Sequence, residues 1–475
     1  LCLGAAMACT AVRAQTSGAQ TSRAQISRTQ TSPDPDSLRS GLTEMLPLFS
    51  FGSVSVADRP AQVTQSGNDF HIQLPLNGFV APADASLQAV AHPAANGAWD
   101  ITALTFPAAG ALGTSIDQVV SYTVGRQAMH GRLDPNLATP STFAADLGAI
   151  TLQGAAGSQT SEQAIERVTV DGTVSGQSGG RVDLLTHDAA YNWHMVARDP
   201  AGQEADNLVR RLDGHVSVVG LDRAQGSRLM AAARTLAKSP GQDDLSPAAR
   251  HSLSDMLDAS DGLLTRIEAD ETLEGLNFNF GGNAGALGRI GMHLTGNAED
   301  QRLDAEVDIA LDELSLATMS ADSAAFLPHH LTARSVLAGI KAVELKALLR
   351  AATAPDVDPA MLQSQATALL ATPGAKAAIE ALAFDVGPLR VRGSARFVPR
   401  VNGEIGADVH ISAIGVDALL AQMQSKPNMQ GALPMLFLAK GMGRVQGENV
   451  VWDVALGGGP ITINGVPFGQ TAKTR

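Results

Sequence analysis

Apolar residues alternate with polar ones along much of this chain. The alternation is clear from Phe70 to Leu76, and it recurs at 99–103, 168–174, 181–186, 191–198 and 215–221. Successive side chains of a strand point to opposite faces, so each run predicts a strand with one buried and one wet face. Turn residues between the runs, such as Gln177 to Gly180 and Asp188-Ala189, predict a meander of antiparallel hairpins.

The period changes between residues 227 and 267. Apolar residues there recur at three- and four-residue intervals, among them Leu253, Leu257, Leu264 and Ile267. This spacing predicts two helices with Pro240-Gly241 between them, and we expect a domain boundary in this segment. The spacing of Leu38 and Leu42 also predicts a short helix within 34–49, which Pro47 ends.

The second half repeats the strand pattern and adds more helices. Strands are predicted at 276–280, 290–294, 303–309, 329–337, 389–397, 405–411, 450–456 and 461–463. Helical spacing covers 345–382, including Ile379 and Leu382, and a helical pair is predicted over 416–442. The predicted fold class is α+β, with long curved antiparallel sheets, half-barrel or taco-like, and helices covering part of one face.

The predicted organisation has five parts: 1–14, 15–36, 37–225, 226–270 and 271–470. Residues 1–14 resemble the end of a secretory signal peptide, because they are apolar and place Val12 and Ala14 at the positions that signal peptidase reads. We therefore expect a periplasmic protein. The basic start of a signal is missing, so we expect the sequence to begin inside the signal or at a misassigned start. A lipoprotein signal ending at Cys9 is the rival interpretation.

Residues 15–36 carry a polar pentapeptide repeat (AQTSG, AQTSR, AQISR, TQTSP) and are predicted to form a disordered leader. Residues 37–225 are the predicted N-terminal β-rich half, 226–270 a helical insert, and 271–470 a C-terminal β-rich half with helices.

Composition excludes several classes of function. Both cysteines, Cys2 and Cys9, lie inside the predicted signal, so the mature chain would have no disulfide, thiolate nucleophile or cysteine-bound metal. A net charge of −13 without any basic cluster argues against a nucleic-acid partner. No apolar run reaches the roughly 18–20 residues of a membrane span, so we expect no transmembrane helix in the mature chain.

Gly176 to Gly180 match the pattern G-x-S-x-G with Ser178 at its centre, and also look like the nucleophile loop of chymotrypsin-like proteases. The hydrolase elbow requires a strand, a sharp turn and a helix. A predicted strand follows here instead, and neither His92 nor His130 stands in a recognisable protease context. The motif therefore predicts a hairpin turn.

Two groups of residues in the sequence carry side chains that could bind a metal ion. Asp304, Glu306 and Asp308 share one face of a predicted strand near Asp312 and Glu313, and these oxygens suit calcium, but a solvated strand face explains the same residues. Among the histidines, His329 and His330 point to opposite faces of a strand. His187 and His194 are predicted on successive strands as cross-strand neighbours, without carboxylates to complete a zinc site.

The glycine-rich segment 281–285, with Gly288, lacks the Lys-Ser/Thr of a phosphate-binding loop and joins two predicted strands. It therefore predicts a flexible hairpin. In all, the sequence predicts no catalytic, cofactor-binding or metal-binding residue, and no enzymatic activity.

The C-terminal sequence combines a strand at 450–456, a glycine turn at 457–460, and an I-x-I-N-G strand within 461–468. With the strand at 70–76 and the segment Phe326-Leu327-Pro328, it resembles the domain of unknown function 2125 family of alphaproteobacteria, and more distantly the YdgA-like and AsmA-like envelope proteins. The resemblance covers mainly 275–468. It implies a long twisted sheet in the periplasm and, for the AsmA-like group, movement of lipids between membranes. That group carries an inner-membrane helix after its signal, which this chain lacks.

A long sheet whose apolar face is only partly covered by helices would leave a groove suited to acyl chains. The apolar helix face at Leu345, Leu348 and Leu349 could equally complete an ordinary core. The leading hypothesis is a non-enzymatic periplasmic envelope protein that binds or transfers a lipid or another hydrophobic molecule. The alternatives are a structural or interaction scaffold for an envelope protein partner, and an uncharacterised hydrolase.

Overall fold

The computed structural model describes most of residues 61–468, with gaps at 116–117, 135–136, 138, 157, 178–179, 238–245, 321–323, 325, 355–356 and 401–402, and a few residues between 35 and 56. The predicted signal lies outside these residues, as does the leader except for Pro35 and Asp36. The structure is 61% strand and 21% helix, in antiparallel sheet. The predicted α+β class is therefore confirmed.

The chain divides into two compact units, Leu1–Thr265 (unit 1) and Arg266–Arg475 (unit 2). The division falls near the end of the predicted insert, 226–270. The insert's two helices, α3 (Arg223–Ala237) and α4 (Pro247–Ala259), precede it. Leu264 and Ile267, which the helical spacing included, lie beyond α4, and Ile267 is already on a strand.

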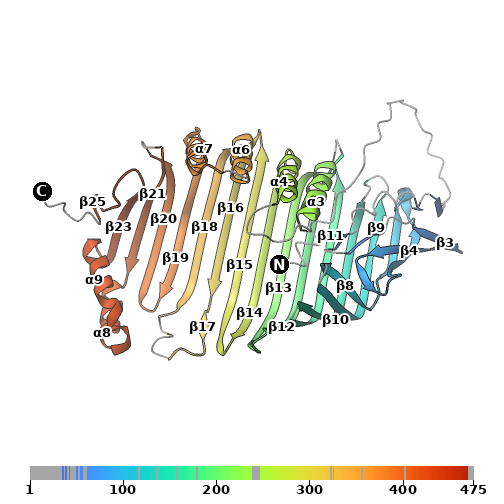
Figure 1. Cartoon of the computed structure of the whole chain (residues 1–475), viewed down its shortest axis with the longest axis horizontal. Helices are drawn as coiled ribbons and strands as arrows, with labels where there is room; N and C mark the ends of the chain where they lie inside the picture. The colour runs from blue at the N-terminus through green and yellow to red at the C-terminus, as the bar shows by residue number, and fades with distance from the viewer. Residues whose placement is uncertain are drawn as a thin grey trace. The chain divides into compact units, whose positions relative to one another are not determined.

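Unit 1 is an antiparallel meander with long strands (Figure 1). The main strands pair in the order β3–β4–β6–β7–β9–β10–β11–β12–β13. The strands of unit 1 are β1 (Ser50–Phe51), β2 (Val54–Val56), β3 (Gln62–Ser66), β4 (Asp69–Asn77), β5 (Phe79–Ala81), β6 (Ser86–Pro93), β7 (Trp99–Thr105), β8 (Ala109–Ser115), β9 (Gln118–Asp134), β10 (Thr139–Ala156), β11 (Gln159–Gly176), β12 (Arg181–Arg198) and β13 (Glu204–Asp222), with a short helix η2 (Ala95–Gly97).

Two buried clusters hold unit 1 together. In the first, Phe70 packs edge-on against Trp99 with ring centroids 4.9 Å apart, and Leu38 and Leu42 are helical and buried beside them. In the second, Tyr122 packs with Phe79 and Phe106, and its hydroxyl donates to the carbonyl oxygen of Pro107 at 2.8 Å. Segments that precede the long strands thus contribute apolar side chains to both clusters.

The predicted turn at Asp188-Ala189 is wrong, because β12 runs through it without a break. Asp188 pairs with Val170 on one side and Gly214 on the other. The glycine makes room for the carboxylate: a Cβ at position 214 would lie 2.5 Å from Asp188 Oδ1. Burial raises the pKa of the Asp188 carboxyl.

Unit 2 is also an antiparallel meander, whose main strands pair in the order β14–β15–β16–β18–β19–β20–β21–β23. These strands are β14 (Arg266–Phe280), β15 (Asn283–Glu299), β16 (Arg302–Asp312), β18 (Pro328–Lys341), β19 (Lys376–Val386), β20 (Leu389–Pro399), β21 (Ile405–Ile414) and β23 (Asn449–Leu456). Short strands flank them: β17 (Ser315–Leu316), β22 (Arg444–Gln446), β24 (Thr462–Ile463) and β25 (Val466–Pro467).

Helices interrupt unit 2 at two points. Between β18 and β19 lie α6 (Ala342–Ala352) and α7 (Pro359–Ala371), at one end of the long strands in Figure 1. Between β21 and β22 lie α8 (Val416–Gln424), the 3-10 helix η4 (Pro427–Ala432) and α9 (Leu433–Met442). Helices α6 and α7 match the first part of the helical stretch predicted over 345–382, and α8 and α9 match the helical pair predicted over 416–442.

The prediction of helix at Ile379 and Leu382 is wrong, because both lie on β19. The segment AAIEALAF is rich in residues that favour helix, so its local preference differs from its structure. Pairing with β18 and β20 on both sides satisfies its backbone and overrides that preference.

Candidate functional site

The sheet of unit 2 has two chemically different faces. One face, which we call the apolar face, presents apolar side chains in rows across neighbouring strands. The Ile290 row consists of register partners on seven strands: Ile290, Leu311, Leu331, Phe384, Val391, Ala413 and Val450. The adjacent Met292 row is built the same way: Met292, Ile309, Ala333, Leu382, Gly393, Ile411 and Trp452.

Within the Ile290 and Met292 rows, the buried residues lie at one end only. Val391, Ala413 and Val450 are 8%, 3% and 5% exposed, because α8 and α9 pack on them through residues such as Leu420 and Leu433. The other four members of the Ile290 row, on β15, β16, β18 and β19, are only half-buried. In the Met292 row, Ile309 is 41% exposed. Apolar side chains on these strands therefore remain accessible.

The helices of unit 2 also expose apolar side chains. Val343 and Leu349 of α6 are 63% and 42% exposed, and Met361 of α7 is 40% exposed. On α9, Met435, Phe437 and Leu438 are 70%, 48% and 48% exposed, and we call these three residues the α9 patch. The face at Leu345, Leu348 and Leu349 therefore does not complete a fully closed core, since Leu349 is exposed.

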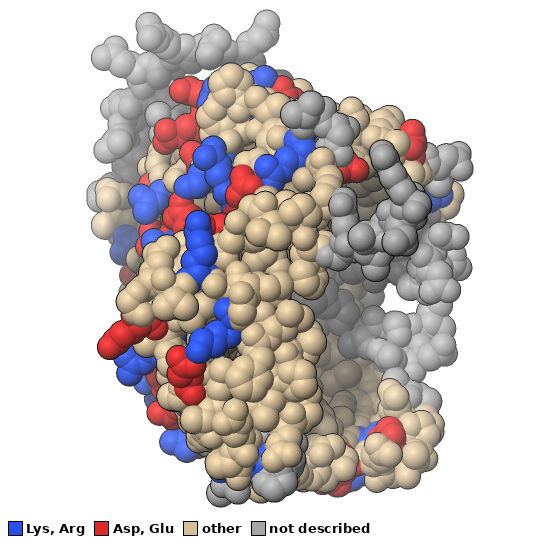
Figure 2. Space-filling view, turned by 90° about the vertical axis from the view of Figure 1, so that its left-hand side faces the viewer, with Lys and Arg blue, Asp and Glu red and all other residues tan. Residues whose placement is uncertain are grey.

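The opposite face of the sheet, the polar face, carries charged rows. Asp270, His293, Asp308 and Arg334 are register partners on β14, β15, β16 and β18. Arg334 Nε lies 2.8 Å from Asp308 Oδ1 and 3.2 Å from Glu306 Oε1. Figure 2, which looks at the side where α8 and α9 lie, shows charged groups gathered along its left edge beside a surface that is largely uncharged.

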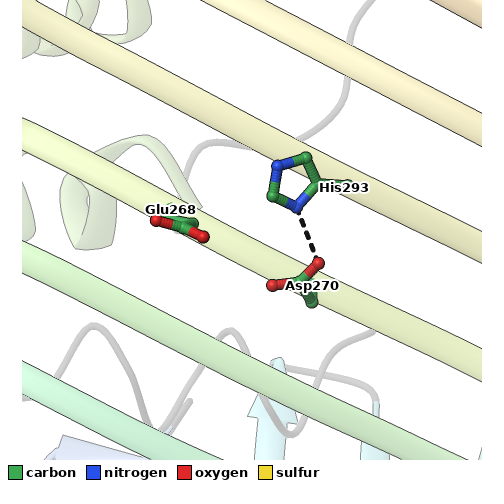
Figure 3. Close-up of side chains that lie close together, drawn as sticks. All are labelled: Glu268, Asp270 and His293. Carbon is green, nitrogen blue, oxygen red and sulfur yellow. Dashed lines mark hydrogen bonds and ion pairs between the residues drawn. The ribbon is translucent and has the colours of Figure 1, made fainter.

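One cluster on the polar face combines an imidazole with two carboxylates. Glu268 and Asp270 lie two residues apart on β14, and His293 is the register partner of Asp270 on β15 (Figure 3). Their three potential ligand atoms lie within 4.8 Å of one another. His293 Nδ1 and Asp270 Oδ1 are hydrogen-bonded at 2.6 Å, and this bond, with the negative charges of Asp270, Glu268 and Asp308, raises the pKa of His293.

The structure separates His187 from His194, so the prediction that they are cross-strand neighbours is wrong. Both lie on β12, seven residues apart, which corresponds to roughly 23 Å along a strand. Each faces a different aspartate: His187 Nδ1 is 3.6 Å from Asp171, and His194 Nε2 is 2.7 Å from Asp206.

The other possible metal ligands in the sequence form hydrogen bonds or ion pairs with neighbouring residues. Asp304 Oδ1 accepts from the backbone of Gly339 at 2.6 Å, while Glu306 and Asp308 pair with Arg334. His330, which lies next to His329 on β18, pairs with Asp312 of β16 at 2.5 Å.

Both predicted hairpins are present. Gly176 and Arg181 bound the β11–β12 hairpin, with Ser178 outside the described residues. Gly281 and Gly282, both with positive φ, form the two-residue turn between β14 and β15.

Comparison of the chain with protein-family models, with curated proteins and with solved structures gave no match. The resemblance to the envelope families therefore stays a prediction. Across the part of the chain that the structure describes, no helix combines the length and apolarity needed to cross a membrane.

Proposed function

We propose that this chain is a non-enzymatic periplasmic envelope protein that binds a lipid or another hydrophobic molecule on the apolar face of unit 2. The observation that carries the proposal is the incomplete cover of that face: Val391, Ala413 and Val450 are buried, whereas Ile290, Leu311 and Leu331 on the same row are not. Contiguous exposed apolar surface is uncommon on soluble monomers and usually marks a binding site.

The dimensions of the face suit an acyl chain. From β15 to β20 the Met292 row crosses five neighbouring strands, a span of roughly 19 Å at about 4.8 Å per strand. One leaflet of a bilayer holds acyl chains about 15 Å long. A chain lying along this row would pass over the small residues Ala333 and Gly393 and contact the larger side chains of Met292, Ile309 and Leu382.

The charged character of the polar face restricts binding to one side of the sheet. Asp270, His293, Asp308 and Arg334 would have to lose hydration to hold an apolar ligand, which is costly for charged groups. A hydrophobic ligand is therefore expected on the apolar face alone.

Native mass spectrometry of the protein purified from its own periplasm, with extraction of bound lipid, tests this proposal. Adjacent residues on β16 supply a matched pair of variants, because Ile309 belongs to the apolar face and Ala310 to the other. We expect a lipid mass on the wild type that persists in Ala310→Glu and disappears in Ile309→Glu. A wild type that carries no lipid, or equal loss in both variants, would contradict the proposal.

A second candidate, an interaction scaffold for an envelope protein, is favoured by the α9 patch. Among the described side chains of α9 none is buried, although the helix sequence LPMLFLAK is strongly apolar. Such a patch on a short helix is typical of a surface that another protein covers. Phe437→Ser should abolish capture of an envelope partner by in-cell crosslinking under this function, and should leave lipid retention unchanged.

A further inference from the structure

Glu268, Asp270 and His293 form a cluster on the polar face of unit 2, away from the proposed lipid site. In the described part of the chain, it is the one group in which three such side chains place ligand atoms within 4.8 Å of one another. The two carboxylates come from one face of β14, and the imidazole comes from the neighbouring strand, where pairing fixes it opposite Asp270.

We propose that Glu268, Asp270 and His293 form a binding site for a divalent first-row transition-metal ion. The mixed donor set decides the class of ion. Calcium and magnesium prefer ligands that are all oxygen, whereas an imidazole nitrogen beside carboxylates suits manganese, iron, cobalt or zinc. Three protein ligands on an open surface would leave further coordination positions to water.

The geometry requires only small movements. Metal bonds of about 2.0–2.2 Å place neighbouring ligand atoms roughly 3–3.5 Å apart, so ligand atoms that lie up to 4.8 Å apart would approach by less than about 2 Å. The side chains of His293 and Asp270 are 35% and 51% exposed, so rotamer changes meet little packing resistance. Arg266 Nη2 lies 2.9 Å from Glu268 Oε2 and would share that carboxylate with the ion.

Neighbouring charges favour a cation at this position. Asp308 is the register partner of His293 on the side away from Asp270, so the imidazole lies between two carboxylates. Arg334 offsets part of this charge through its ion pair with Asp308. Binding would tie β14 to β15 at a point where their side chains are held by a single hydrogen bond between His293 and Asp270.

The His410 pair supplies a matched control. His410 Nδ1 lies 2.8 Å from Asp453 Oδ1, also across two paired strands of unit 2. Arg444 takes the other oxygen of Asp453, and no second acid completes a group of three within the described residues. A simple histidine–aspartate pair and a metal site can therefore be compared in one molecule.

Titration of the metal-depleted full chain with Mn²⁺, followed by electron paramagnetic resonance, tests the proposal. Manganese is chosen because it has little affinity for the thiols of Cys2 and Cys9. We expect one saturable Mn²⁺ per chain, with an imidazole nitrogen coupling in the pulsed spectrum. His293→Gln should remove that coupling, and both His293→Gln and Glu268→Gln should weaken binding by at least about tenfold.

His410→Gln should bind Mn²⁺ like the wild type. Circular dichroism of each variant checks that the sheet is intact, and Glu268→Gln preserves side-chain shape if His293→Gln disturbs it. Absence of saturable binding in the wild type would overturn the proposal. So would binding that survives both His293→Gln and Glu268→Gln, or a nitrogen coupling that only His410→Gln removes.

Discussion

Units 1 and 2 are both antiparallel meanders of alternating sequence, yet they differ in how far their apolar side chains are buried. Among the residues that the structure describes, 30 of the 42 buried hydrophobic residues belong to unit 1 and 12 to unit 2. The exposed large hydrophobic residues show the reverse, with 3 in unit 1 and 15 in unit 2. An alternating strand therefore specifies which side chains share a face, but not whether anything covers that face.

The difference lies in the second layer. In unit 1, Leu38 and Leu42 pack against β4 and β7, while Phe79 and Leu112 of β5 and β8 pack in the second cluster. In unit 2, the buried cluster is limited to the end where α8 and α9 pack. Unit 1 thus has a more completely covered core, whereas part of the apolar face of unit 2 stays uncovered.

The largest expected effect comes from truncating one apolar side chain in each unit. Phe70 is completely buried against Trp99, so Phe70→Ala should lower the free energy of unfolding of unit 1 by about 3–5 kcal/mol. Ile309 is 41% exposed, so Ile309→Ala should cost unit 2 less than about 1.5 kcal/mol. Urea unfolding monitored by hydrogen exchange of peptides from each unit measures both. Equal losses of unfolding free energy in the two units would contradict the difference in burial between them.

A smaller effect is expected from adding a methyl group to a strand glycine. At Gly214 a Cβ would lie 2.5 Å from Asp188 Oδ1, so Gly214→Ala should destabilise unit 1 by about 1–3 kcal/mol. At Gly291 in unit 2 the nearest atom is 3.9 Å away, and Gly291→Ala should be neutral within about 0.5 kcal/mol. The same unfolding assay compares the two variants. If Gly214→Ala did not destabilise unit 1, the strands around Asp188 would be less tightly packed than the structure shows.

The smallest expected effect concerns the wet face of unit 1. Hydrogen bonding from Arg167, at 3.0 Å, together with the charge of Arg126, lowers the pKa of Asp146 below its usual value. The carboxylate therefore stabilises the folded state above the unfolded pKa, and this contribution disappears as pH falls through the lowered folded pKa.

Asp146→Asn should consequently reduce stability near neutral pH and have progressively less effect below pH 3.8, the ordinary pKa of the group. Thermal unfolding of the wild type and the variant across pH 2 to 7 measures this. A difference that grows on acidification would refute the assignment of Asp146 as an ionised partner of Arg167.

The sequence predicts most of the helices and strands, but not where a strand continues without a turn. The alternation at 70–76 and 290–294 predicted β4 and β15, and the helical spacing around Leu345 and over 416–442 predicted α6 and α8. Asp188-Ala189 predicts a turn in the sequence, because aspartate and small residues are typical of turns. The space that Gly214 provides on the neighbouring strand is a tertiary property, so local pattern could not reveal it.

The sequence does not reveal the His293 cluster for a related reason. Helical spacing that includes Ile267 obscures the alternation of Ile267 and Ala269 with Glu268 and Asp270. That alternation was the available signal for a strand starting near residue 266. The partner of Asp270 depends on strand register, which brings together residues 23 positions apart.

Photo-crosslinking with a diazirine fatty acid, followed by peptide mapping, tests the central claim most directly. The apolar face of unit 2 predicts crosslinks on β15, β16, β18 and β19, with Ile309 and Leu331 among the labelled residues. Excess unlabelled fatty acid should abolish them, and the buried cluster around Phe70 in unit 1 should stay unlabelled. Labelling spread evenly over both units, or confined to the α9 patch, would contradict the claim that this face is a hydrophobic binding site.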